Sequence, residues 1–530
     1  MNQKTTSLFS ILFVILSIGI LKAQTLSTII SGPENKLEMN ERTLKVLGTD
    51  GDGLYVLSSS RSLTGGMMEK FKIQKYDVAN FTKKWVKDFS LNISSEPFEA
   101  AYLVKGKVLV FYSTWEKTDK TKTLNIKTIS SKGEIKDDPN KEVRIKSGMF
   151  DFAKRDFYFA FSPDSSKILV VNKFQDKKKP EEVTAVLLDA ISFKKIWEKT
   201  IPNKFNNASV LSYFYRTDNA GNLYYLLSYL TTDIVNNVFC KTKAADVEPT
   251  SMPLQLESGR ITNSNLFSRL KDFNYDNAGI RFIESANEIS YELTSEGQLY
   301  IGGIFKDFKQ RKAGMFQYLI DAETMKTLNK KEEFFDASIE NSFSSFGKVK
   351  TSFGCDFAIH KIEQVKGTFF VFADAFNLVG FNPDNTVLSD TYGQLLFTSK
   401  QGEMGWSVFL PGKSRNVGAE QNTLQVYSGN GKLNLCYGIP DPKTISGSSL
   451  APLQAKFEAA KNAKNDITFL SISEKGIDDV FGYSTPNKKE SIYLLDNFIT
   501  LNGSFLLPFI DFNNMTGKSN YIKFVLVGLK

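Results

Sequence analysis

The chain has 530 residues, of which 42% are hydrophobic and 13% are aromatic, and its formal net charge is +8. This amount of apolar material excludes an intrinsically disordered chain, and so small a charge is not the footprint of a nucleic-acid-binding protein. The single histidine, His360, excludes a zinc site built from several histidines. The three cysteines, Cys240, Cys355 and Cys436, are too few for a fold that depends on disulfides, although one bridge with one spare thiol stays open.

The first residues have the layout of a secretion signal. Lys4 precedes an apolar run over residues 8–21, and Ala23 offers a small residue for cleavage. The run is too short to span a bilayer comfortably, so we expect residues 1–23 to be a signal peptide cleaved after Ala23, with an uncleaved anchor as the alternative. No later stretch is apolar enough to cross a membrane. We therefore expect an exported protein of the periplasm, the cell surface or the extracellular space, without a transmembrane segment in the mature chain.

One local pattern then recurs eight times: a strand, a tight turn that usually contains glycine, a strongly apolar strand, a polar loop and a further strand. The aromatic and β-branched composition favours strands, and turns of the Asn-Gly, Glu-Gly and Lys-Gly type are typical of hairpins. The eight apolar strands are expected at residues 54–58, 107–112, 167–171, 222–229, 298–304, 368–373, 432–437 and 504–510.

A strand that is apolar along its whole length must be covered on both faces. Four-stranded units stacked around an axis provide this cover and leave only short outer edges, so the repeat predicts an all-β fold: one β-propeller of eight antiparallel blades over residues 25–530. Seven blades with one irregular unit, or a tandem of β-sandwiches, are the alternatives. The last unit ends after its third strand, and residues 26–30 are β-prone. We therefore expect the N-terminus to supply the missing outer strand of the last blade.

One segment departs from the strand pattern. Residues 449–464 have Pro452 near their start and apolar residues along one side, which is typical of a short helix. The sequence predicts this helix as an insertion in the seventh unit, where it would seal the edge of the ring or, alternatively, bind a partner.

Residues 157–171 read Phe-Tyr-Phe-Ala-Phe-Ser-Pro-Asp-Ser-Ser-Lys-Ile-Leu-Val-Val. Over residues 161–167 this resembles the F-S-P-D-G-K repeat of bacterial exported TolB-like and WD-repeat-like β-propellers, with Ser165 where that pattern usually has glycine. The other seven units share the rhythm of the repeat and lack the Ser-Pro-Asp signature. The resemblance implies a propeller and, as the usual role in such families, protein interaction in the periplasm or at the cell surface.

No arrangement of residues in the sequence predicts a catalytic site. A Cys355–His360 pair would have to meet across five positions of a strand, which does not place two side chains on one face. The turn from Asp50 to Gly53 lacks the later acidic ligand of a calcium loop, so a hairpin turn is the better interpretation. Carboxylate chemistry stays open, because a glycosidase needs only two acids and 58 are present.

Two loops that follow apolar strands mix basic and aromatic residues, a combination that could grip an anionic glycan or an acidic protein surface. The candidate binding residues are Trp115, Lys306, Lys309, Arg311 and Lys312. We therefore expect a monomeric, non-catalytic binding protein for a protein or glycan ligand, without cofactor or metal. A carbohydrate-active hydrolase or lyase that uses channel carboxylates, and a structural envelope component, are the alternatives.

Overall fold

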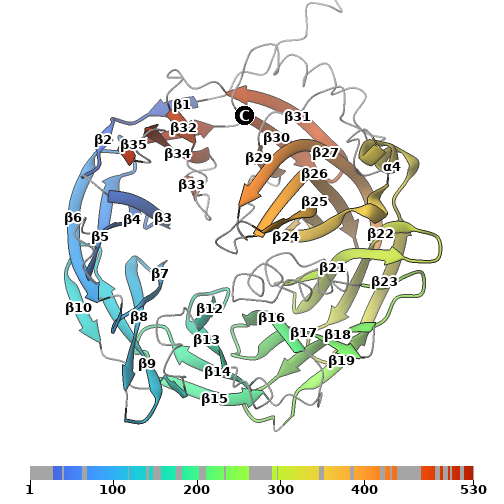
Figure 1. Ribbon diagram of the computed structural model, residues 1–530, viewed down its shortest axis with the longest axis horizontal. Helices are drawn as coiled ribbons and strands as arrows, with labels where there is room; N and C mark the ends of the chain where they lie inside the picture. Colours follow the sequence, from blue (N-terminus) through green and yellow to red (C-terminus); the bar gives the residue numbers. More distant parts are fainter. Residues whose placement is uncertain are drawn as a thin grey trace, which may run out of the picture.

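Eight antiparallel sheets stand around a common axis in the computed structural model, so the chain is a β-propeller of eight blades (Figure 1). This confirms the predicted fold class and rules out both the seven-bladed ring and the tandem of sandwiches. The structure describes residues 28–38, 41–61, 68–92, 94–116, 118–138, 143–146, 157–174, 182–201, 210–231, 234–246, 248–261, 289–294, 296–344, 351–381, 387–417, 424–429, 432–437, 467–483, 490–492, 499–501, 504–513 and 518–528.

The first four blades each begin with a strand near the axis and proceed outward. Their strands are as follows: blade 1, β3 (Glu41–Thr49), β4 (Gly53–Arg61), β5 (Met68–Asp77) and β6 (Lys83–Asn92); blade 2, β7 (Phe98–Val104), β8 (Lys107–Glu116), β9 (Thr121–Ile129) and an outer strand in two pieces, β10 (Ile135–Asp138) and β11 (Arg144–Lys146); blade 3, β12 (Phe157–Phe161), β13 (Lys167–Phe174), β14 (Glu182–Asp189) and β15 (Lys195–Ile201); blade 4, β16 (Val210–Thr217), β17 (Leu223–Thr231), β18 (Ile234–Thr242) and β19 (Thr250–Leu254).

The last four blades follow the same order, except that the outer strand of blade 8 comes from the N-terminus. Their strands are as follows: blade 5, β20 (Ile289–Leu293), β21 (Gln298–Asp307), β22 (Lys312–Asp321) and β23 (Thr327–Phe334); blade 6, β24 (Asp356–Val365), β25 (Thr368–Phe381), β26 (Val387–Lys400) and β27 (Glu403–Val417); blade 7, β28 (Leu424–Gly429), β29 (Lys432–Tyr437), β30 (Ile467–Ser473) and β31 (Gly476–Tyr483); blade 8, β32 (Glu490–Ile492) and β33 (Ile499–Leu501), then β34 (Ser504–Asn513), β35 (Lys518–Gly528), and β1 (Thr28–Ser31) with β2 (Asn35–Lys36).

All eight apolar stretches of the sequence are second strands of blades. In blade 5, nine of the ten residues of β21 are buried, whereas the outer strand β23 has no buried residue. A second strand is covered by a neighbouring blade on each face, and an outer strand meets solvent along its free edge. The tight turns behave as predicted: Lys105 (φ 48°) and Gly106 (φ 74°) both adopt the left-handed conformation that a two-residue hairpin of type I′ requires.

The ring is closed by the two ends of the chain. Residues Thr28 to Ser31 of β1 pair antiparallel with Gly528 to Val525 of β35, and β2 pairs further along the same strand. Behind this pairing, Val46 and Leu54 of blade 1 pack in one apolar cluster with Leu506 and Phe524 of blade 8. The predicted closure by the N-terminus is therefore confirmed.

Removing residues 25–36 should lower the melting temperature by at least about 5 °C, because the last blade then loses its outer strand and the ring its closing contact. Differential scanning calorimetry measures this. Removal of residues 1–24 is the matched control and should leave the melting temperature unchanged. Equal melting temperatures for the two truncated chains would contradict closure by β1.

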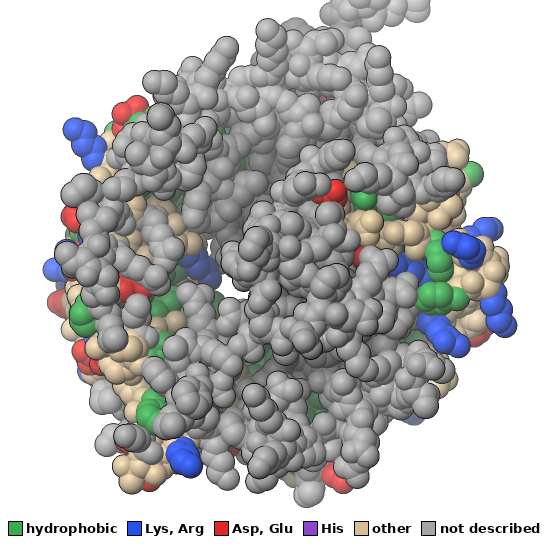
Figure 2. Space-filling view, viewed as in Figure 1, with side chains coloured by type: hydrophobic (Ala, Val, Ile, Leu, Met, Phe, Trp, Pro, Cys, Tyr) green, Lys and Arg blue, Asp and Glu red, His purple; other side chains and the backbone are tan. Residues whose placement is uncertain are grey.

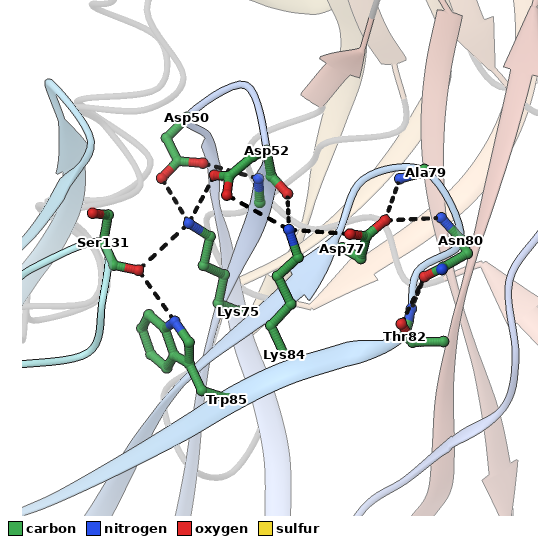
Figure 3. A network of polar contacts seen from close by, with 11 residues as sticks. Asp50, Asp52, Lys75, Asp77, Ala79, Asn80, Thr82, Lys84, Trp85 and Ser131 are labelled. Atoms are coloured by element: carbon green, nitrogen blue, oxygen red, sulfur yellow. Dashed lines mark hydrogen bonds and ion pairs between the residues drawn. The ribbon is translucent and has the colours of Figure 1, made fainter.

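The turn from Asp50 to Gly53 is a hairpin turn, as predicted. Its ends are joined by hydrogen bonds from Gly53 N to Asp50 Oδ1 (2.9 Å) and from Asp50 N to Gly53 O (3.1 Å). The ammonium of Lys75 lies 2.9 Å from Asp50 Oδ2 and 2.8 Å from Asp52 Oδ1, so it occupies the position that a cation would need (Figure 3). In the described part of the chain, no group of acidic, histidine or cysteine residues could hold a metal ion.

The same network joins blade 1 to blade 2. The backbone carbonyl of Ser131, in the turn between β9 and β10, accepts hydrogen bonds from Trp85 Nε1 (3.2 Å) and Lys75 Nζ (3.5 Å) (Figure 3). The Lys84 ammonium extends this network within blade 1, because its Nζ lies 3.0 Å from Asp77 Oδ2. These charges stabilise the packing of neighbouring blades and leave little for a ligand to bind.

Blades 1 and 2 each contain a buried triplet of one glutamate, one serine and one lysine. In blade 1, Glu41 accepts hydrogen bonds from Ser58 (2.7 Å) and Lys72 (3.0 Å). In blade 2, Glu99 accepts a hydrogen bond from Ser113 (2.6 Å) and lies 3.0 Å from Lys122, with both charged side chains at 0% exposure. A buried charge must be paired, so each triplet links the first three strands of its blade.

Replacing Lys122 alone with methionine should cost about 3–5 kcal/mol of unfolding free energy, because the Glu99 carboxylate stays buried without its cation. The triple variant Glu99→Leu, Ser113→Ala, Lys122→Met removes the whole polar triplet, so its unfolding free energy should fall much less. Urea denaturation of the three proteins measures both values. If the triple variant is as unstable as the single one, charge burial is not the cause.

Helical structure in the described residues is confined to α4 (Ala337–Ser344) and the 3₁₀-helix η1 (Ser352–Gly354). α4 was not predicted, although its start carries a signal: the Asp336 carboxylate accepts the N–H of Ile339 (2.9 Å) as an N-cap. The helix predicted at 449–464 lies outside the described residues, as do residues 1–23. No helix in the described part of the chain has the length and apolarity that a membrane span requires.

The Ser-Pro-Asp segment forms the turn between β12 and β13. Asp164 Oδ1 accepts hydrogen bonds from the Ser162 hydroxyl (2.6 Å) and the Ser166 N–H (2.9 Å), and these bonds lower the pKa of Asp164 to about 2. Ser165 is held at φ 53°, in the left-handed region that favours glycine. The geometry explains why the repeat that this segment resembles carries glycine at this position.

Ser165→Gly should therefore raise the unfolding free energy by about 0.5–1 kcal/mol, because glycine has no Cβ to strain this conformation. Ser166→Gly is the matched control at a position without positive φ, and it should lower the unfolding free energy by a similar amount. Chemical denaturation measures both. A loss of stability in the Ser165 variant would show that the backbone is not strained there.

Candidate functional site

The loop between β21 and β22 presents an aromatic ring and several cations on the surface. It contains Phe308 and Arg311 and is followed by Lys312, and its backbone is preformed. The Asp307 carboxylate accepts the N–H groups of Lys309 (2.8 Å) and Gln310 (3.1 Å), bonds that lower the pKa of Asp307. A loop ordered by its own hydrogen bonds loses little conformational entropy when a ligand binds.

Phe308 and Arg311 pack around one aromatic ring, that of Phe353 in η1. The rings of Phe308 and Phe353 meet edge to face at 5.3 Å, and Arg311 Cζ lies 5.8 Å from the centre of the Phe353 ring. Phe308 remains 44% exposed. We refer to Phe308, Lys309, Arg311, Lys312 and Phe353 as the blade-5 platform.

α4 holds Phe353 in position. Glu340, on α4, accepts a hydrogen bond from the Ser352 N–H (3.0 Å) and a second one from the Ser352 hydroxyl. Ser352 immediately precedes Phe353, so the helix fixes the ring against which the loop packs. Sequence reasoning missed Phe353, because 41 positions separate it from Lys312 and only the fold brings the two segments together.

The five residues proposed from the sequence do not form one site. Lys309, Arg311 and Lys312 lie together and are exposed. Lys306 does not belong to the loop: it lies in β21, is 2% exposed, and its ammonium lies 3.7 Å from Asp356 Oδ1 of blade 6. A lysine buried in this way supports the contact between two blades.

Trp115 lies far from the platform. It is in β8 of blade 2, across the ring from β21 (Figure 1). Its side chain is half-buried, and the lysine opposite it in the sheet, Lys122, is paired with Glu99. The basic loop around Trp115 therefore offers fewer available charges than its sequence indicates.

Lys and Arg side chains gather at the rim of the ring where Figure 1 places β22 and β23 (Figure 2). Consecutive antiparallel strands reverse direction, so the loops after second strands open on one face and the turns after first strands on the other. The platform therefore belongs to one face of the propeller. The turns at Lys105 and Lys132 belong to the opposite face.

The single histidine is paired with a carboxylate within blade 6. His360 Nε2 lies 2.5 Å from Asp374 Oδ2, and Asp374 is 0% exposed. Burial alone would lower the pKa of His360, but the charge and hydrogen bond of Asp374 outweigh it, and the pKa is raised. Cys355 is a buried thiol whose pKa burial raises. A histidine held by the Asp374 carboxylate and a thiol kept protonated by burial do not make a nucleophile–base pair.

A hydrolase or lyase would need channel carboxylates, and the innermost strands of blades 5 and 6 carry Glu292 and Glu363. Glu292 of β20 and Glu363 of β24 interact electrostatically, but Glu363 forms an ion pair with Lys361. Burial raises the pKa of Glu292, Glu363 adds to the rise, and Arg216 opposes it. Among the described residues of β20 and β24, Glu292 is the carboxyl group without an ion pair, whereas glycoside hydrolysis commonly uses two carboxyl groups.

No protein-family model matches the sequence. No curated protein matches it either. Among solved structures, the chain is similar to the β-propeller domain of the Trilobed protease from Pyrococcus furiosus, with TM-score 0.31 and 10% identity over 72% of this chain and 95% of that one. It is also similar to the polysaccharide lyase Uly1, with TM-score 0.35 and 10% identity over 95% of this chain and 100% of that one.

A prolyl endopeptidase is a further similar structure, with TM-score 0.36 and 10% identity over 91% of this chain and 55% of that one. Similarities of this size carry no information about activity. The fold rests on the eight sheets of the chain itself.

Proposed function

We propose that this protein is an exported, non-catalytic propeller that binds an anionic ligand, a glycan or an acidic protein surface, through the face that carries the blade-5 platform. The platform is the observation that supports the proposal. An exposed aromatic ring and an arginine match the composition of binding surfaces, where both are enriched. Lys309 and Lys312 add the positive charge that attracts an anionic ligand.

Export is the second part of the proposal. It rests on the signal-like layout of residues 1–23, with cleavage after Ala23. The resemblance of residues 161–167 to TolB-like and WD-repeat-like propellers agrees with a place in the periplasm or at the cell surface. We further propose that the protein is a monomer and that residues 25–530 form the mature unit. A carbohydrate-active hydrolase or lyase that uses channel carboxylates, and a purely structural role in the envelope, stay the alternatives.

The triple variant Lys309→Ala, Arg311→Ala, Lys312→Ala should bind an anionic probe about ten-fold more weakly or worse, because three neighbouring charges lose contact with it. Immobilised heparin is the glycan probe and poly-glutamate the peptide probe, in surface plasmon resonance at 0.15 M salt. Phe308→Ala should also weaken binding, which net charge alone would not explain.

The matched control removes the same charge from the opposite face: Lys105→Ala, Lys132→Ala, Lys194→Ala. These three side chains are exposed in turns of blades 2 and 3. The control should bind like the wild type. Equal weakening in the two triple variants would mean that net charge, and not the platform, holds the probe, and the proposal would fail.

A further inference from the structure

Three inner strands bring together a tyrosine, an arginine and a glutamate. Tyr158 lies on β12, Arg216 on β16 and Glu292 on β20, and these strands begin blades 3, 4 and 5. Arg216 Nη1 donates a hydrogen bond to the Tyr158 hydroxyl (2.8 Å), and Arg216 and Glu292 interact electrostatically. We call these three residues the inner cluster. Figure 1 shows β12 and β16 at the inner ends of their blades, and β20 holds the same place in the sheet of blade 5.

A backbone irregularity precedes Arg216. The pairing of β16 with β17 shifts register between Tyr213 and Arg216, and Phe214 has φ 57°, a conformation that costs a bulky residue free energy. The Tyr291 hydroxyl lies within hydrogen-bond distance of the carbonyls of Phe214 and Tyr224 and shares its one proton between them, which holds the bulge in place. A β-bulge re-aims the side chains that follow it. Here it sets Arg216 beside Tyr158, where its charge also acts on Glu292.

The inner cluster retains unused hydrogen-bonding capacity. Within the described residues, both hydrogen bonds of the Arg216 guanidinium run through Nη1, to Tyr158 and to the carbonyl of Tyr215. Its Nε and Nη2 groups remain as donors. The Glu292 carboxylate is half-buried and, in the same part of the chain, forms no hydrogen bond or direct ion pair. Half-buried groups with free donors or acceptors are hydrogen-bonded by water or by a ligand.

A ligand group that contacts both Arg216 and Glu292 must accept a hydrogen bond from the guanidinium and donate one to the carboxylate. A hydroxyl does both. A carboxylate or sulfate would satisfy Arg216 and be repelled by Glu292, and an ammonium would do the reverse. We propose that the inner cluster binds a neutral, hydroxyl-rich ligand, a sugar unit, whose adjacent hydroxyls bridge Arg216 and Glu292.

The surroundings agree with a neutral ligand. Two further charges that act on Glu292, those of Lys361 and Glu363 in β24, neutralise each other in an ion pair. Tyr158 is 37% exposed, so part of its ring is open to the apolar face of a sugar. Its hydroxyl accepts from Arg216 and keeps its own proton to donate to the ligand.

This site is separate from the platform. Arg216 and Glu292 are each the penultimate residue of their strand, at the end where first strands turn into second strands. The platform lies at the other end, after a second strand. The inference therefore goes beyond the proposed function, and either of the two can fail while the other stands.

A glycan array with the purified full-length mature chain tests the site. The array carries neutral oligosaccharides, uronic-acid and sulfated oligosaccharides, and acidic peptides as separate classes. Binding to at least one neutral oligosaccharide is expected. Isothermal titration with that oligosaccharide should then show about ten-fold weaker binding for Glu292→Gln and about three- to ten-fold weaker binding for Tyr158→Phe.

Two controls accompany these variants. Glu198→Gln removes a carboxylate from the outer strand β15 and should bind like the wild type. The platform triple variant should also keep its affinity for the neutral oligosaccharide. Unchanged melting temperatures for Glu292→Gln and Tyr158→Phe separate lost contacts from lost folding, and Tyr158→Phe keeps the ring in place.

Three outcomes would overturn the assignment. The first is an array on which no neutral oligosaccharide binds, so that only water bridges Arg216 and Glu292. The second is binding confined to anionic glycans or acidic peptides, since Glu292 would repel these. The third is a neutral ligand whose affinity is unchanged in Glu292→Gln and Tyr158→Phe, because it then binds elsewhere.

Discussion

The antiparallel pairing of β1 with β35 is the contact on which the rest of the ring depends. In a propeller each blade packs only against its two neighbours, so an open ring would expose one apolar face of the first blade and one of the last. Here that junction is filled by the cluster around Leu54 and Phe524. Because both ends of the chain meet in one sheet, the first blade cannot separate from the last without breaking main-chain hydrogen bonds.

Most charges inside the ring have structural partners. Lys75 holds the turn at Asp50, Lys122 is buried with Glu99, and Lys306 reaches Asp356 of the next blade. These pairs stabilise blades and the contacts between them. Two sets of charged side chains in the described part of the chain retain hydrogen-bonding capacity that a ligand could use: the exposed cations of the platform, and the Arg216 and Glu292 side chains on the inner strands. The first suits an anionic surface, and the second suits a neutral hydroxyl-bearing group.

The candidate site was only partly predictable. The sequence of the loop after β21 indicated basic and aromatic character, and the exposed Lys309, Arg311 and Lys312 retain it. Lys306, one residue inside the strand, looked the same in the sequence and is buried. Phe353 lies in η1, in the connection from blade 5 to blade 6, and only the fold brings it against the loop. Nothing in the sequence indicated a role for Arg216, because its orientation depends on a β-bulge that no local pattern predicts.

The sequence by itself determined the repeat, the eight apolar second strands, the turns and the ring closure. The strands and turns depend on side-chain alternation and on glycine, which are local properties. The closure follows from the order of the strands, since the last unit lacks its outer strand and the N-terminus is β-prone. Only the tertiary structure decided which charges are buried in pairs and which remain available. That distinction depends on neighbouring blades, whose residues lie dozens of positions apart in the chain, and on backbone irregularities such as the one at Phe214 that turn a side chain from one face of a strand to the other.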